Sequence, residues 1–122
     1  AKNEQELMWP TFEQSLMILT TVMSRRKSAQ SDRATLDAGL KSFSTDSGPA
    51  LPAFAGWQVR GVSDEHTVLE RHGAGPDLSL GDKSLLIPGH IDPTVNLHDW
   101  IVAVRGDRVE AVWPIEARGA IF

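Results

Sequence analysis

The sequence predicts a mainly β domain: a small antiparallel β-barrel or sandwich of about seven short strands, with little helix. Three observations carry this prediction. Short runs of apolar and β-branched residues recur along the chain, and loops rich in glycine, proline and polar residues separate them. Few segments show the apolar period of an amphipathic helix. The 122 residues are one domain's worth, so we expect residues 1–122 to form a single domain.

Six of the expected strands precede the C-terminal hairpin. In chain order they are residues 16–23, 33–37, 40–43, 57–62, 67–72 and 84–87. The first is apolar and β-branched along its length, which predicts a strand covered on both faces. The second and third come from an ambiguous stretch, residues 31–44, and are interpreted as short extended pieces. The fourth and fifth are predicted to pair through the short connection between them.

A hairpin is the clearest element of the C-terminal part. Two apolar runs, residues 100–105 and 108–113, flank Gly106 and Asp107. Glycine at the first position of a two-residue loop is typical of the turns that join antiparallel strands. Pro114 ends the second run, because proline cannot donate to a strand ladder. Residues 115–122 are interpreted as a last edge strand.

Composition excludes several classes of function. The net charge is −4, and the one basic cluster is residues 25–27, so no basic stripe predicts nucleic-acid binding. No apolar run reaches the length of a membrane span, so no membrane partner is expected. The chain has no cysteine, which excludes disulfides and thiolate catalysis. With no signal-peptide pattern in the sequence, we expect a cytoplasmic protein.

His90 and Asp92 are the candidate site residues. They lie two positions apart between Pro88 and Pro93. In an extended segment, residues i and i+2 point to the same face, and a residue before proline avoids the α region. An imidazole and a carboxylate on one face are able to share a divalent cation. On spacing alone, the favoured interpretation is a histidine that hydrogen-bonds its neighbour at the end of a strand.

Four sequence blocks, in this order, carry a resemblance to a known family. They are residues 21–25, 36–48, 63–66 and 88–97, the last reading Pro88-Gly89-His90-Ile91-Asp92-Pro93-Thr94-Val95-Asn96-Leu97. From about Phe12 onward, the chain resembles the C-terminal domain of the D-threonine aldolase and D-serine dehydratase family. The resemblance implies pyridoxal phosphate enzymes in which an N-terminal α/β barrel, absent from this sequence, carries the cofactor.

The resemblance also implies a metal site at His90 and Asp92. Aspartate at the second position is similar to the aldolase-type version and favours a manganese-like ion, whereas cysteine there is similar to the zinc-dependent dehydratase. The implied reaction is cleavage of D-3-hydroxy amino acids. Two positions depart from the family pattern, because Thr67 stands where glycine is frequent and His98 where tyrosine is frequent. From the residues themselves, Asn96 is a candidate to hydrogen-bond the backbone and hold the bend of this segment, and Asp99 is a candidate to cap a turn. A supporting role behind the metal-binding histidine is a further possibility for this stretch.

The implied partners are the N-terminal barrel of the same enzyme, a second subunit in a full-length homodimer, and a D-amino acid substrate. None of the chain's four lysines, Lys2, Lys27, Lys41 and Lys83, matches the context of the cofactor lysine. We therefore expect pyridoxal phosphate only in the full-length enzyme and no activity from this chain alone. The surface that would meet the barrel is expected to be apolar and to drive self-association.

Two alternatives remain open. One is a domain of a D-serine dehydratase-like ammonia-lyase, which uses the same scaffold for elimination. The other is a standalone, non-catalytic β-barrel that binds a ligand or partner.

Overall fold

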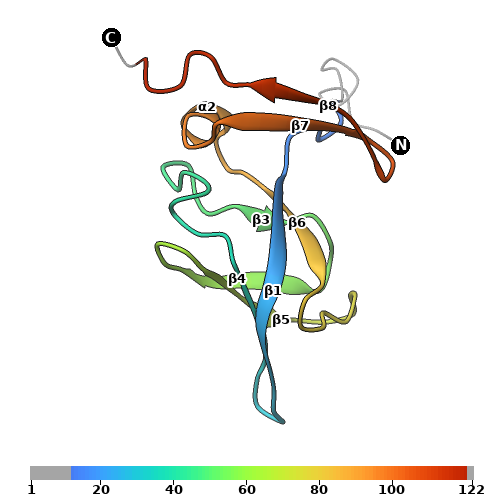
Figure 1. The fold of residues 1–122 in the computed structure, drawn as a ribbon. Helices are drawn as coiled ribbons and strands as arrows, with labels where there is room; N and C mark the ends of the chain where they lie inside the picture. Colours follow the sequence, from blue (N-terminus) through green and yellow to red (C-terminus); the bar gives the residue numbers. More distant parts are fainter. Residues whose placement is uncertain (1–11, 121–122) are drawn as a thin grey trace, which may run out of the picture.

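A computed structural model describes residues 12–120 of the chain, and these form eight strands and one short helix (Figure 1). The elements are β1 (Ile18–Lys27), β2 (Asp32–Leu36), β3 (Leu51–Pro52), β4 (Trp57–Val62), β5 (Thr67–Arg71), β6 (Lys83–Ile87), α2 (Ile91–Val95), β7 (Trp100–Arg105) and β8 (Arg108–Pro114). The mainly β prediction is confirmed. No helix in this part of the chain is long and apolar enough to cross a membrane.

Six strands form one antiparallel sheet that curls into a nearly closed barrel. Their order is β3-β6-β1-β2-β5-β4, and the two end strands, β3 and β4, lie against each other. The longest strand, β1, joins the two halves: Ile18–Thr21 pair with β6, whereas Val22–Lys27 pair with β2. An irregularity between Val22 and Ser24 marks the change of partner, since a bulge increases local twist and bends a strand.

The barrel interior is filled by apolar side chains from most of its strands. The largest fully buried ones are Phe43, Leu36, Leu69, Leu86 and Val22. The prediction that residues 16–23 are covered on both faces was wrong. Side chains on β1 alternate instead, with Leu19 66% exposed and Met23 53% exposed. In an antiparallel barrel only one face of a strand points inward, so apolar residues on the other face stay outside.

Two predicted extended pieces are turns. Residues 40–43 form a turn closed by hydrogen bonds from the backbone N–H groups of Ser42 and Phe43 to the Gly39 carbonyl. Phe43 is nevertheless completely buried, so its hydrophobicity serves the core without a strand. Within the described part of the predicted last strand, residues 115–120 also form turns, and the Ile115 N–H bonds the Asp99 carbonyl.

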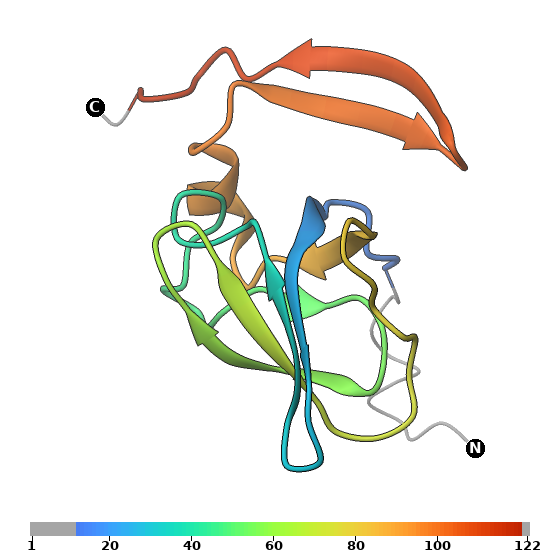
Figure 2. The same ribbon diagram turned by 60° about the horizontal axis from the view of Figure 1, so that its bottom comes forward.

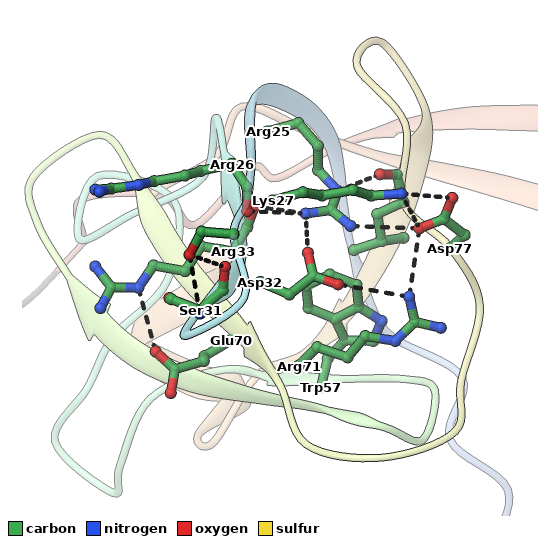
Figure 3. A network of polar contacts seen from close by, with 12 residues as sticks. Arg25, Arg26, Lys27, Ser31, Asp32, Arg33, Trp57, Glu70, Arg71 and Asp77 are labelled. Atoms are coloured by element: carbon green, nitrogen blue, oxygen red, sulfur yellow. Dashed lines mark hydrogen bonds and ion pairs between the residues drawn. The ribbon is translucent and has the colours of Figure 1, made fainter.

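A charged cluster around Trp57 closes the end of the barrel remote from α2 (Figure 3). The buried Trp57 ring has the guanidinium carbons of Arg25 and Arg71 at 4.9 and 5.5 Å from its centroid. The same arginines bind carboxylates. Arg25 pairs with Asp32. Arg25 and Arg71 also contact the Asp77 carboxylate, at 3.3 and 3.4 Å respectively. Each arginine thus combines ring stacking with ion pairing, two interactions that its planar cation makes together.

The β7–β8 hairpin stands apart from the barrel (Figure 2). In the described part of the chain, the two strands pack against each other but against no other strand and not against α2. The register places one set of side chains on a common face, here called the hairpin apolar face: Trp100, Val102, Val104, Val109, Val112 and Pro114. The first five are 51–63% exposed. An isolated two-stranded hairpin is only marginally stable in water, so this face calls for a partner.

The charged cluster predicts a loss of stability in acid. The hydrogen bond from Arg25 holds the pKa of Asp32 below its usual 3.8. A carboxyl whose pKa is lowered by folding stabilises the fold above its unfolded-state value and loses that contribution as the pH falls through the folded-state value. We therefore expect the free energy of unfolding, from urea denaturation, to fall below a pH of about 4.

Asp32→Asn should lower the stability at neutral pH by about 1 kcal/mol and flatten the acid decline. Asp107→Asn, in the exposed hairpin turn, is the matched control and should follow the wild-type curve. Parallel wild-type and Asp32→Asn curves between neutral and acid pH would contradict the role of the Arg25–Asp32 pair.

Candidate functional site

The loop between β2 and β3, residues 37–50, brings the four family-like blocks together. At its start, it is locked to the 63–66 connection by backbone hydrogen bonds. The N–H groups of Leu40 and Lys41 donate to the carbonyls of Ser63 and Asp64, each at 2.9 Å. The approach is so close at Gly39 that a Cβ there would overlap the Ser63 carbonyl oxygen. Glycine is therefore required at this position by contact with backbone.

Asp37 ties the same loop to β1. Its carboxylate accepts hydrogen bonds from the Thr20 hydroxyl at 2.7 Å and the Thr21 N–H at 2.8 Å. Burial by itself raises the pKa of Asp37, but these hydrogen bonds to the ionised form outweigh it and hold the pKa below the usual value. Asp37 is thus a structural carboxylate that joins the first two blocks.

The far part of the loop holds the last block. The Ser44 N–H donates to the Thr94 hydroxyl at 3.1 Å, and that hydroxyl donates to the His90 carbonyl at 2.6 Å. Thr94 is almost completely buried. The ring nitrogen Nε2 of His98 lies 2.7 Å from the Ser42 carbonyl and donates to it. His98 therefore fastens the segment after α2 to the loop.

His90 and Asp92 do not share one extended segment, so that part of the sequence argument was wrong. His90 is extended, with φ −148° and ψ 119°, but it is the cap residue of α2, and Asp92 lies in the first helical turn. Proline is tolerated in a first turn, because backbone N–H groups there have no helical partner. Pro93 therefore does not prevent the helix, and the same-face rule for strands does not apply to this pair.

Asp46 is the residue whose contact with His90 sequence reasoning did not predict. Its Oδ2 lies 2.6 Å from Nδ1 of His90, and its Oδ1 accepts a hydrogen bond from the Ser44 hydroxyl at 2.7 Å. The Ser44 bond, followed by the His90 bond, holds the pKa of Asp46 below its usual value. Both partners are partly open to solvent, with the His90 side chain 43% exposed and that of Asp46 51%.

Asn96 hydrogen-bonds the backbone, as predicted, but neither Asn96 nor Asp99 contacts His90 among the hydrogen bonds of the described residues. The side-chain oxygen of Asn96 accepts the Gly119 N–H at 2.8 Å, and Asp99 pairs with Arg118. Both fasten the segment after the hairpin to the stretch between α2 and β7. In the sequence, the one indication of a role for Asp46 was its position in the second family-like block, residues 36–48. Its contact with His90 becomes visible only in the folded structure.

The donor set at this surface is small. Among residues 12–120, no three histidine, aspartate or glutamate side chains lie together as a ready metal cluster. The Asp92 carboxylate accepts no hydrogen bond from another described residue, and His90 keeps Nε2 free of the Asp46 contact. An imidazole and a carboxylate with open positions fit a divalent transition metal whose remaining ligands come from elsewhere.

Comparison with known families settles the relationship. A family model described as "Putative serine dehydratase domain" matches residues 15–104, which is most of the chain. The chain belongs to this family. The resemblance inferred from the four blocks is thereby confirmed.

Two relatives that this chain matches are much longer than the chain itself. It is 49% identical over 112 residues to a 3-hydroxy-D-aspartate aldolase of Paracoccus denitrificans and 44% identical over 109 residues to a D-threonine aldolase of Arthrobacter. Each match covers 88% of this chain but only 27% and 28% of the relative. The crystal structure of D-threonine aldolase from Filomicrobium marinum matches with a TM-score of 0.80 and 40% identity, covering 93% of this chain and 30% of that one.

The close approach at Gly39 generates a prediction for this serine dehydratase-type domain. Gly39→Ala forces backbone apart where the loop meets residues 63–66, so we expect a loss of about 1–3 kcal/mol in the free energy of unfolding. Gly61→Ala is the matched control, because a Cβ at Gly61 meets open space. The control should change stability by no more than about 0.5 kcal/mol. Equal effects in chemical denaturation would contradict the requirement for glycine at position 39.

Proposed function

We propose that this chain is the C-terminal β domain of a pyridoxal phosphate-dependent lyase that cleaves D-3-hydroxy amino acids. The observation that supports this most directly is the pair of aldolase matches, at 49% and 44% identity, each confined to about a quarter of the relative. The second support is the open surface at which His90 and Asp92 remain available to solvent.

In this proposal, His90 and Asp92 hold a divalent metal, with manganese favoured over zinc. Manganese accepts nitrogen and carboxylate oxygen, and the chain offers no thiolate. A metal here supplies Lewis-acid polarisation of the substrate's hydroxyl group. The chain's own residues bind and orient: His90 presents a ring nitrogen, Asp92 presents an unengaged carboxylate, and the loop to Asp46 keeps the histidine in place.

The cofactor belongs to the missing part of the enzyme in this proposal. The described lysines all make surface contacts: Lys27 with Asp77, Lys41 with Glu65, and Lys83 with Thr21. None of these three lysines hydrogen-bonds to His90. Lys2 falls outside the described residues. This supports a reaction in which an N-terminal barrel provides the Schiff-base lysine and this domain provides the metal side.

The hairpin apolar face supports the proposed partner, the α/β barrel of the same polypeptide in a homodimeric enzyme. Five uncharged side chains more than half exposed on a free-standing hairpin form a surface typical of an interface. The hairpin begins just after α2, so a domain docked on it is held close to His90 and Asp92. The relatives, with over two thirds of their length outside the match, contain a region large enough to be that partner.

A second candidate function is elimination from D-serine or a related amino acid. The description of the matched family, a serine dehydratase domain, favours it. Asp92 favours the aldolase over this alternative, since the resemblance associates a cysteine at that position with the zinc-dependent dehydratase.

A chimera tests the proposed reaction. Residues 12–120 replace the matching C-terminal quarter of the Arthrobacter D-threonine aldolase, and the product is assayed with D-threonine and D-serine. We expect cleavage of D-threonine that a chelator abolishes. His90→Ala and Asp92→Asn should each lower kcat/KM at least about 100-fold, because each removes a proposed metal ligand.

Asp107→Asn in the same chimera is the control and should retain full activity. The isolated chain should give no Schiff-base absorbance with pyridoxal phosphate. Full activity in the presence of chelator would overturn the metal role, and faster turnover of D-serine than of D-threonine would favour the dehydratase.

The uncovered hairpin predicts self-association of the isolated chain. Val104→Lys places a charge in the hairpin apolar face and should shift the sedimentation profile towards monomer. Asp107→Asn changes the net charge by the same amount at the turn, off that face, and should leave the profile unchanged. A wild-type chain that stays monomeric at high concentration would contradict the assignment of this face as an interface.

A further inference from the structure

We infer that Asp46 is a positioning residue, which fixes the tautomer of His90 so that Nε2 is the nitrogen offered to a metal. The inference deepens the proposed function and rests on its metal role for His90. It concerns a residue that lies 44 positions from His90 in the sequence and meets it only in the fold.

The argument begins with the proton between the two side chains. An ionised carboxylate only accepts hydrogen bonds, so at 2.6 Å the proton between the two side chains lies on Nδ1 of His90. In the neutral ring the other nitrogen, Nε2, then carries the lone pair. In a neutral imidazole without this partner, either nitrogen is able to carry the proton. Asp46 therefore selects which nitrogen is free to coordinate.

The carboxylate is itself held in place by a closed circuit of hydrogen bonds. His90 contacts Asp46, Asp46 accepts from the Ser44 hydroxyl, the Ser44 N–H donates to Thr94, and the Thr94 hydroxyl returns to the His90 carbonyl. The Thr94 link is buried, with 1% of that residue exposed. The circuit grips both the backbone and the ring of His90, which fixes the ring's direction as well as its tautomer.

A plain surface ion pair is the competing explanation. Both side chains are about half exposed, and exposed pairs contribute little to stability. The two explanations differ in what they predict for the ring. A surface pair leaves the tautomer and the metal affinity insensitive to Asp46, whereas a positioning residue controls both.

Nitrogen-15 NMR of the histidine side chains in the full 122-residue chain tests the tautomer directly. Spectra are taken without metal at a pH of about 8, where a typical histidine is neutral. In the wild type we expect His90 to carry its proton on Nδ1, and in Asp46→Asn we expect that preference to be lost. His98 is the internal reference, because its Nε2–H donates to Ser42 and should not change. An unchanged His90 tautomer in Asp46→Asn overturns the inference.

Calorimetric titration with Mn²⁺ tests the consequence for binding. Asp46→Asn should weaken Mn²⁺ binding about 10–100-fold, as expected for loss of the partner behind a metal-binding histidine. Ser44→Ala, which keeps the Asp46 carboxylate but removes its anchor, should give a smaller loss. Asp92→Asn should weaken binding without altering the His90 tautomer. Unchanged Mn²⁺ affinity in Asp46→Asn overturns the inference.

The failure of the proposed metal role has a different outcome. A wild-type chain that binds no Mn²⁺ overturns that role, while the tautomer measurement still decides whether Asp46 controls the ring. Backbone amide spectra and thermal unfolding of each variant separate a local change at His90 from a loss of the fold, since Asp46 lies on the exposed side of the loop.

Discussion

The backbone lock between residues 39–41 and 63–64 is the interaction on which the rest of the structure depends. Two hydrogen bonds and a contact that only glycine allows place the start of the β2–β3 loop against the β4–β5 connection. From that point the loop sends Phe43 into the core and carries Ser42, Ser44 and Asp46 along the rim. The start of the β2–β3 loop thus positions residues of both the core and the candidate site.

The two ends of the barrel use polar groups for opposite purposes. At one end, Arg25 and Arg71 are paired with carboxylates and stacked on Trp57, so their charges are satisfied within the domain (Figure 3). At the other end, His90 has one ring nitrogen engaged, and the Asp92 carboxylate accepts no hydrogen bond from a described residue. Polar groups left available beside an apolar hairpin are typical of a surface completed by another domain.

Local patterns in the sequence were sufficient for much of the fold and for few details of the site. The paired strands β4 and β5 and the β7–β8 hairpin follow from apolar runs and turn residues that act over a few positions. For residues 40–43 the same reasoning predicted a strand where the structure has a turn. A buried Phe43 gives the same hydrophobic signal in a turn as in a strand. The contact between Asp46 and His90 could not be predicted from the sequence, since no local pattern shows which distant carboxylate will contact a given histidine.

The change of partner along β1 has a consequence for the order of folding. The β4–β5 and β7–β8 pairings connect neighbours in sequence and close small loops, whereas the pairing of β1 with β6 joins the two ends of the barrel sequence. Closing a long loop costs more entropy, and non-local pairings are formed slowly. The segment that carries His90 directly follows β6, and β3, which also pairs with β6, directly follows the loop that carries Asp46. We therefore expect the contact between His90 and Asp46 to form with the pairing of β3 and β6 rather than as a preformed local motif.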